Sequence, residues 1–322
     1  LGLQALLSFL NANDALGDLE AKLFSLDSDD SLPDFASKLS YLTEMTKPHI
    51  AIGGAAHAFP QTTGDFFRRR GILWYGPWSN SLSLKNSENN PVLTLPTDDL
   101  EIEALMDYVG RMGITEATFV HSQGDQTASL ATLAAAAAQV RGLTFKPLSV
   151  PLDFRNWPSL KNELQTAQAV FLWVPPGQAA AIVRSLKTQL SPQTLWLTNS
   201  LNATGHELAA MSAGFWENVV FPAVLIPKKD ISQSYDLVIR KYGLPGLTLD
   251  YQTYLGFAQG QLLARAIVDS HGDPAGLRLA FSRLKTDGTL LAKSEATSDK
   301  PFYLAASDSR GDWRPLSEAG GP

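Results

Sequence analysis

Residues 72–80 read ILWYGPWSN, an apolar run that ends in a polar turn, and the earlier residues 50–57 read IAIGGAAH. Each stretch begins with the apolar character of a buried strand, and residues 59–70 between them have the pattern of a helix that Gly71 closes. Strand, small-residue turn, helix, strand and polar turn follow one another as they do in a parallel α/β sheet. Ligands of such sheets gather at the carboxyl ends of the strands, so residues 76–80 are predicted to form part of a ligand rim.

The composition describes a soluble globular protein of two domains. The chain has 322 residues, of which 44% are hydrophobic and 18% are charged, and its formal net charge is -6. A chain of this length exceeds one ordinary core, so two domains are expected. The acidic balance offers no basic face for nucleic acid, and no apolar run approaches the roughly 20 residues that cross a bilayer. We expect neither a nucleic-acid partner nor a transmembrane segment.

The sequence contains little evidence for an enzyme active site. Cysteine is absent, which excludes disulfides, zinc-thiolate sites, iron-sulfur clusters and a cysteine nucleophile. The sequence also lacks a Gly-x-Ser-x-Gly elbow, a Gly-x-x-x-x-Gly-Lys phosphate loop and a His-Glu-x-x-His zinc pair. Asp27, Asp29 and Asp30 are interpreted as a solvated acidic loop rather than as a cation site. We expect a protein that is not an enzyme and that has no metal or cofactor.

The order of predicted elements indicates an α/β fold of two Rossmann-like lobes, with parallel central sheets joined by a hinge of several strands. Five strands alternate with helices over residues 98–224, which makes a self-sufficient second lobe at 96–227. The first lobe is predicted to comprise residues 1–95 and 228–322, including strands over 20–26 and near 302–306. Hinge crossovers are expected near residues 92–97, 225–229 and 285–300.

The order and spacing of several segments resemble the type I periplasmic solute-binding proteins of the leucine/isoleucine/valine-binding family of ABC importers. These segments are residues 9–12, 23–30, 50–54, 71–77, 95–99 and 251–266. The resemblance implies a monomer in the periplasm that closes its two lobes over a small molecule and presents the closed form to a membrane permease. Members of this family begin with a strand ahead of the first helix. That strand, and any signal peptide or lipid anchor, is expected upstream of residue 1.

The resemblance also implies which residues of the first lobe contact the ligand. After the strand 49–53 the family often offers a small hydroxyl residue, whereas this chain has Ala55-Ala56-His57. His57 could bind an anion, or it could cap the next helix. Trp78, Ser79 and Asn80 form the next contact loop, with one flat apolar face and two hydrogen-bonding side chains. The alternative for this loop is a turn that packs Trp78 against the lobe.

In the second lobe, the resemblance places ligand contacts on three loops. Their candidate residues are Gln126, Trp173, Pro175, Asn199 and Ser200. Helix capping by the loop 122–126 and core packing of Trp173 are the alternatives. Relatives that bind amino acids place an acidic residue near the end of the strand 194–197, but residues 198–200 read TNS here.

The missing acidic residue decides the expected ligand. A buried ammonium without a counter-charge keeps its desolvation cost, which is several kcal/mol on typical magnitudes. We therefore expect a small organic ligand with an apolar or aromatic body, such as an aromatic or aliphatic acid, an amino-acid derivative or a hydrophobic metabolite, rather than a free α-amino acid. A ligand-sensing regulator of the same fold, a branched-chain amino-acid binder and an α/β enzyme with an unrecognised site are the alternatives.

Overall fold

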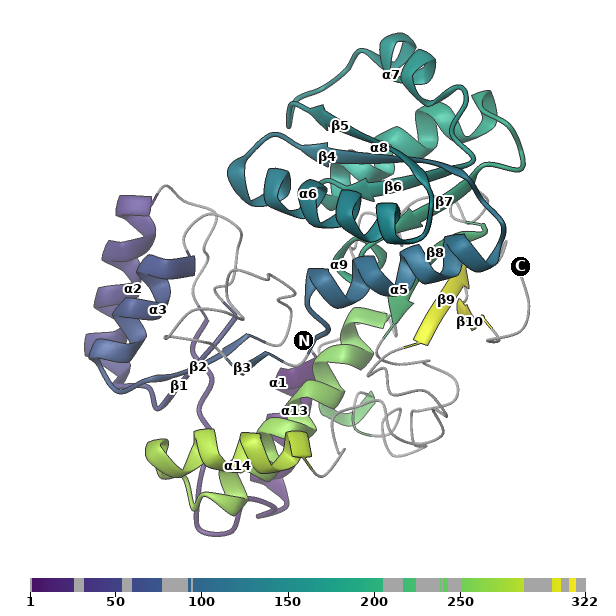
Figure 1. Cartoon of the computed structure of the whole chain (residues 1–322). Coiled ribbons are helices and arrows are strands. Elements are labelled where there is room, and N and C mark those ends of the chain that lie inside the picture. Colours follow the sequence, from purple (N-terminus) through teal and green to yellow (C-terminus); the bar gives the residue numbers. More distant parts are fainter. Residues whose placement is uncertain are drawn as a thin grey trace. The chain divides into compact units, whose positions relative to one another are not determined.

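The chain divides into two compact units, each made of separate stretches of sequence. The computed structural model describes residues 2–25, 32–53, 60–76, 92–93, 95–204, 217–223, 238, 240–242, 251–286, 303–307 and 313–316 (Figure 1). The first unit comprises Leu1–Leu95 and Pro227–Thr297, and the second comprises Pro96–Ile226 and Ser298–Pro322. Each unit combines helices with a sheet that is wholly or mainly parallel, which confirms the predicted α/β class.

The first unit contains a three-stranded parallel sheet in the order β1-β2-β3. The strands are β1 (Ile50–Ile52), β2 (Leu73–Gly76) and β3 (Val92–Leu93). The helices that the structure describes in this unit are α1 (Gly2–Ala12), α2 (Leu32–Thr46), α3 (Pro60–Arg69), α13 (Tyr251–Asp269) and α14 (Pro274–Thr286).

Strand β2 separates the two apolar layers of the first unit, because successive side chains of a strand point to opposite faces. Leu73 and Tyr75 pack with residues of α1, α13 and α14. Trp74 lies on the other face, where it packs with Phe67 of α3 and Leu39 of α2. Buried side chains on both faces of one short strand explain why its sequence is a continuous apolar run.

The second unit contains a seven-stranded sheet in the order β10-β9-β8-β7-β6-β4-β5. Its parallel strands are β4 (Glu116–Ser122), β5 (Thr144–Val150), β6 (Ala169–Trp173), β7 (Leu195–Thr198) and β8 (Val219–Ala223). Two antiparallel strands, β9 (Tyr303–Ser307) and β10 (Trp313–Pro315), extend the edge beyond β8. The helical elements are α5 (Asp98–Arg111), α6 (Asp125–Val140), α7 (Trp157–Leu164), α8 (Pro176–Leu186), the 3-10 turn η1 (Lys187–Gln189) and α9 (Ser200–Thr204).

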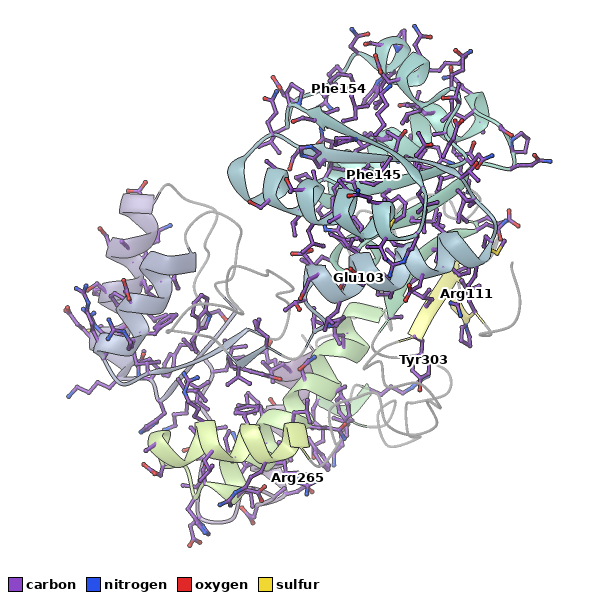
Figure 2. The ribbon with its side chains drawn as sticks, in the orientation of Figure 1. Glu103, Arg111, Phe145, Phe154, Arg265 and Tyr303 are labelled. Carbon is purple, nitrogen blue, oxygen red and sulfur yellow. The ribbon has the colours of Figure 1, made fainter. Side chains whose placement is uncertain are left out.

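Helices cover both faces of the second sheet (Figure 1). Helices α5 and α6 pack on the face that carries Phe119 and Phe171, with Phe145 beside them. Helices α7 and α8 pack on the opposite face, where Phe154 lies (Figure 2). The alternation of buried side chains along β4 and β6 therefore supplies two cores to one sheet.

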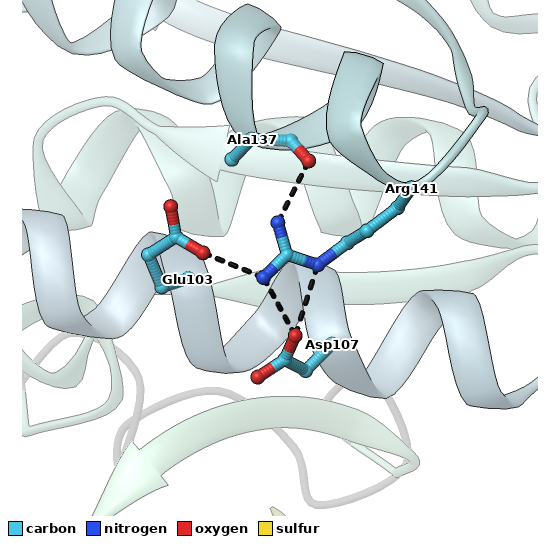
Figure 3. A network of polar contacts seen from close by, with 4 residues as sticks. All are labelled: Glu103, Asp107, Ala137 and Arg141. Carbon is cyan, nitrogen blue, oxygen red and sulfur yellow. Dashed lines mark hydrogen bonds and ion pairs between the residues drawn. The ribbon is translucent and has the colours of Figure 1, made fainter.

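Arg141 fastens α6 to α5 on one of these faces (Figure 3). Its Nε and Nη2 donate to Asp107 Oδ1 at 2.9 and 2.6 Å, and Nη2 also donates to Glu103 Oε2 at 2.6 Å. Nη1 donates to the carbonyl oxygen of Ala137 at 2.7 Å. Partial burial disfavours the charged guanidinium, but the two carboxylates outweigh it and raise the pKa of Arg141. The hydrogen bonds between α6 and α5 are therefore assisted by opposite charges.

Two expectations about the first lobe are wrong. Residues 303–315 belong to the second unit, because β9 pairs antiparallel with β8 through Val220 and Ala306 and fills the edge that β8 would otherwise expose. The predicted strand over 20–26 is not formed by its described residues, 20–25, which have no regular structure. Instead, Asn11 Nδ2 donates to the carbonyl oxygen of Ala21 at 2.7 Å, and Asn11 Oδ1 accepts from the Ala21 N–H at 3.0 Å. This side chain therefore holds the segment without a sheet partner.

Candidate functional site

The strand order of the second unit singles out one place on its sheet. The first parallel strand of the unit, β4, has β5 on one side and β6 on the other. The chain therefore runs outward from β4 in both directions, and the loops after β4 and β6 diverge at their carboxyl ends. In open α/β sheets, ligands bind in the crevice at such a switch point. The loops that follow Ser122 and Trp173 are accordingly the candidate binding edge of this unit.

Backbone and side-chain hydrogen bonds hold the loop that follows β4. The Gln123 N–H donates to the carbonyl oxygen of Val150 at 2.9 Å. Gly124 is the N-cap of α6 and has φ +144°, a conformation that favours glycine. The hydroxyl group of Thr127 lies 2.5 Å from the carbonyl oxygen of Ser122. Gln126 lies in the first turn of α6, and its side chain is outside the described part of the structure.

Trp173, at the end of β6, is part of the core. Its side chain is 3% exposed, and its ring stacks on Phe119 with centroids 5.3 Å apart. Its Nε1–H donates to Asp98 Oδ1 at 2.9 Å. These contacts favour the packing interpretation of Trp173. Pro175 is exposed two residues later, where it is the N-cap of α8 and presents apolar surface at the switch point.

Asn199 and Ser200 follow β7 and take part in a buried polar cluster with Glu101, Thr198 and Asn202, here called the β7 polar cluster. Ser200 donates its N–H to Glu101 Oε2 at 3.0 Å and its hydroxyl proton to Glu101 Oε1 at 2.5 Å. Asn199 Oδ1 accepts from the N–H of Asn202 at 2.8 Å, which leaves the Nδ2 group of Asn199 as a donor. All five side chains are buried.

The side chain of Asn202 joins the ends of β6 and β7. Its Nδ2 lies 2.9 Å from the carbonyl oxygen of Val174 and 2.9 Å from Thr198 Oγ1. Thr198 in turn donates its hydroxyl proton to the carbonyl oxygen of Leu172 at 3.0 Å. Since these groups bind one another, the segment 198–202 has a fixed shape before any ligand arrives.

Asp98 and Glu101 are the residues of this edge that the sequence analysis missed. Both lie in the first turn of α5, and both are buried, Glu101 completely. The helical spacing of Asp98, Glu101, Ile102 and Leu105 was the available signal, because it places two acids on the same face as buried apolar residues. Acids on a buried face need donors from another element, here Trp173 and Ser200.

In the first unit, the ends of β1 and β2 are anchored to each other and to α13. Trp74 Nε1–H donates to the carbonyl oxygen of Gly53 at 2.6 Å, and Gly53 has φ +86°, which explains the glycine after β1. The hydroxyl of Tyr75 donates to Gln259 Oε1 at 2.6 Å. The predicted contact residues His57, Trp78, Ser79 and Asn80 come after these strands and lie outside the described residues.

The described residues contain neither a candidate metal site nor a helix suited to a membrane. No group of three or more His, Cys, Asp or Glu side chains among them could hold a metal ion. None of the helices that the structure describes combines the length and the apolar character needed to cross a membrane.

Comparisons with known proteins agree on one fold. The profile of a family described as periplasmic binding protein matches residues 2–302. A substrate-binding periplasmic protein from Ralstonia solanacearum is 16% identical with a TM-score of 0.80, covering 98% of this chain and 94% of that one. No protein of curated function matches the sequence significantly.

Two further structures of this fold contain ligands. One is a branched chain amino acid ABC transporter protein from Thermus thermophilus with bound valine, 14% identical with a TM-score of 0.78, covering 98% of this chain and 90% of that one. The other is an ABC transporter solute binding protein from R. palustris in complex with benzoate, 15% identical with a TM-score of 0.71 and the same coverage of each chain, 98% and 90%. At such identities the likeness shows the fold alone.

Proposed function

Because the chain belongs to the periplasmic binding protein family, we propose that it captures a small organic ligand outside the cytoplasm and delivers it to a membrane transporter. The protein acts by binding and release, without catalysis. Its ligand has an apolar or aromatic body and a few polar groups, and is not a free α-amino acid. The carboxyl ends of the parallel strands are the binding edges, as is usual in open α/β sheets.

The chemistry of the β7 polar cluster carries the choice of ligand class. The residues that follow β7 supply amide and hydroxyl groups, and the neighbouring carboxylate of Glu101 already accepts two hydrogen bonds from Ser200. Both described carboxylates at this edge, those of Asp98 and Glu101, are buried and already accept hydrogen bonds from the protein. The Nδ2 group of Asn199 suits a carboxylate or carbonyl oxygen. Exposed Pro175 adds apolar surface. Benzoate, the ligand of the R. palustris protein, belongs to the proposed class, and valine, the ligand of the T. thermophilus protein, does not.

A thermal-shift screen with matched pairs of compounds tests this function. Each amino acid is compared with the acid that lacks its amino group: valine with isovalerate, and phenylalanine with hydrocinnamate, with benzoate and octanoate as further acids. We expect the acids to raise the melting temperature, since a ligand at about 100 times its Kd stabilises the native state by about 2.7 kcal/mol. A larger shift with valine than with isovalerate would assign the protein to the branched-chain amino-acid binders. Hydrolysis or other turnover of a bound acid would contradict the non-catalytic assignment.

We also propose that residues 78–80 of the first unit contact the ligand. The double substitution Ser79→Ala with Asn80→Ala is expected to weaken binding of the best acid at least tenfold, because it removes two hydrogen bonds of about 1 kcal/mol each. Trp78→Ala is expected to weaken it further by removing an apolar wall. Affinity is measured by titration calorimetry, with melting temperature recorded in parallel.

Gln4→Ala with Ser37→Ala is the matched control, since both residues are exposed polar side chains on helices of the same unit. Binding by this control should equal that of the unaltered protein. An unchanged affinity in the Ser79 and Asn80 variant, with its fold intact, would remove this loop from the site.

A further inference from the structure

A group of basic side chains gathers at the amino ends of the strands of the first unit. Lys47 and His49 lie between α2 and β1, and Arg68, Arg69 and Arg70 lie at the end of α3 before β2. Because β1 and β2 are parallel neighbours, these two connections lie at the same edge of the sheet, where the Leu73 N–H donates to the carbonyl oxygen of His49 at 3.0 Å. All five side chains are exposed. We call them the amino-edge basic patch.

Little within the patch offsets its charge. Arg68 Nη2 lies 3.5 Å from Asp65 Oδ1, and the two side chains are 60% and 43% exposed, so solvent weakens this ion pair. The guanidinium of Arg70 lies 3.8 Å above the centre of the Phe66 ring, which orients it without neutralising it. The dipole at the carboxyl end of α3 explains basic residues at positions 68 and 69. It does not explain Lys47, which lies on the neighbouring connection.

The patch contrasts with the rest of the chain. The whole sequence has 26 basic and 32 acidic residues. Without the four Lys and Arg residues of the patch, 22 basic residues would face the same 32 acidic ones. The protein as a whole is thus repelled by anionic surfaces, and this edge has the opposite local charge.

Exposed apolar side chains lie on α2, the helix that leads into the patch. Tyr41 and Met45 are each 67% exposed and lie one helical turn apart. They project away from the sheet, since Leu39 supplies the inward face of α2. Met45 precedes Lys47 by two residues. The acidic side chain of this stretch, Glu44, accepts a hydrogen bond from the hydroxyl of Ser40 at 3.3 Å.

We propose that the amino-edge basic patch, with Tyr41 and Met45 beside it, binds the surface of an anionic lipid bilayer. Basic side chains attract anionic headgroups, and aromatic or aliphatic side chains next to them enter the boundary between headgroups and acyl chains. A bilayer supplies anionic headgroups and an apolar boundary side by side, which suits arginines next to Tyr41 and Met45. An acidic protein partner could use the same side chains, because Tyr, Met and Arg are common in protein interfaces, and it is an outcome of the test below. The patch lies at the amino ends of β1 and β2, opposite the strand ends that form the proposed binding edge of this unit, so lipid binding requires no small ligand.

Co-sedimentation of the full chain with vesicles tests this surface. Vesicles of phosphatidylglycerol and phosphatidylcholine are compared with vesicles of phosphatidylcholine alone, at about 0.1 M salt and again at several times that concentration. We expect binding to the anionic vesicles only, and its loss at high salt. Arg68→Glu with Arg69→Glu should weaken binding at least tenfold, and Tyr41→Ser with Met45→Ser should weaken it at least threefold.

The control keeps the same change of charge on the same unit. Lys22→Glu with Arg265→Glu alters two exposed basic residues outside the patch (Figure 2 labels Arg265), and this variant should bind within twofold of the unaltered protein. Equal losses in the two charge-reversal variants would show a general charge effect and overturn the proposal. Absence of vesicle binding by the unaltered protein would also overturn it and would point instead to an acidic partner. Full binding by the Tyr41 and Met45 variant would overturn the proposed role of these two side chains in the bilayer.

Discussion

Glu101→Ala is expected to lower the free energy of unfolding of the second unit by about 3–5 kcal/mol, because two hydrogen bonds to a charged group are each worth about 1.5–3 kcal/mol. Glu101 is completely buried, and its two oxygens accept the N–H and the hydroxyl proton of Ser200. Alanine would leave both donors buried near an apolar methyl group. The midpoint of guanidinium unfolding, followed by circular dichroism, measures the loss.

Two comparisons make this prediction specific to the buried carboxylate. Glu103→Ala removes the same side chain from an exposed position two residues along α5, where it pairs with Arg141, and should cost about 0.5 kcal/mol. Glu101→Gln keeps the shape, and its amide can accept from the Ser200 N–H while it donates to the Ser200 hydroxyl oxygen, so about 1–2 kcal/mol is expected. Equal effects of the two alanine substitutions would show that the buried carboxylate of Glu101 contributes no more to stability than an exposed one.

The regular part of the second unit could be predicted from the sequence because local pattern and burial agree there. The alternation of five strands with helices that is predicted over residues 98–224 is present in the structure as the strands β4 to β8 and the helices between them. These elements follow one another with short connections, and consecutive parallel strands pair in the sheet except for β5 and β6, which lie on either side of β4. The alternation of strands and helices was then sufficient to identify the fold class.

The errors arise where a distant segment decides the structure. The short apolar run around residue 304 shows that a strand forms, but not which sheet it joins. Its partner, β8, lies about 80 residues earlier, and Ala305 and Ala306, which pair with that strand, are completely buried. The run 20–26 has the alternation of a strand, yet the side chain of Asn11 already satisfies the backbone of Ala21. Local periodicity predicts neither the partner strand of the run around residue 304 nor the hydrogen bonds between Asn11 and Ala21.

The candidate site could also be predicted only in part from the sequence. The loops that follow the strands could be located from the sequence, since ligand edges of parallel sheets lie at strand ends. The role of each side chain could not. Ser200 and Asn199 were predicted as ligand contacts, and the structure shows them bound to Glu101 and Asn202, one of them a residue 99 positions earlier. Direct contact of Asn199 with a ligand stays a prediction.

Substitutions of Trp173 distinguish a packing role of this side chain from a ligand-binding role. Trp173→Ala is expected to destabilise the second unit by about 3–5 kcal/mol, because it removes a large core side chain. The ring that is lost is 3% exposed and stacks on Phe119. Trp157→Ala is the matched control: Trp157 is only partly buried and meets Phe154 edge-on, so a smaller loss is expected. Guanidinium unfolding compares the two variants.

Trp173→Phe then isolates the indole N–H. Phenylalanine keeps a ring against Phe119 and removes the donor to Asp98 Oδ1, so a loss of about 1–2 kcal/mol in stability is expected. If Trp173 only packs, affinity for the best acid from the screen should change less than twofold, measured by calorimetry well below the melting temperature of the variant. A tenfold loss of affinity would instead place the indole in the binding site. Asp98 would then link that site to the first turn of α5, which begins three residues after the chain leaves the first unit.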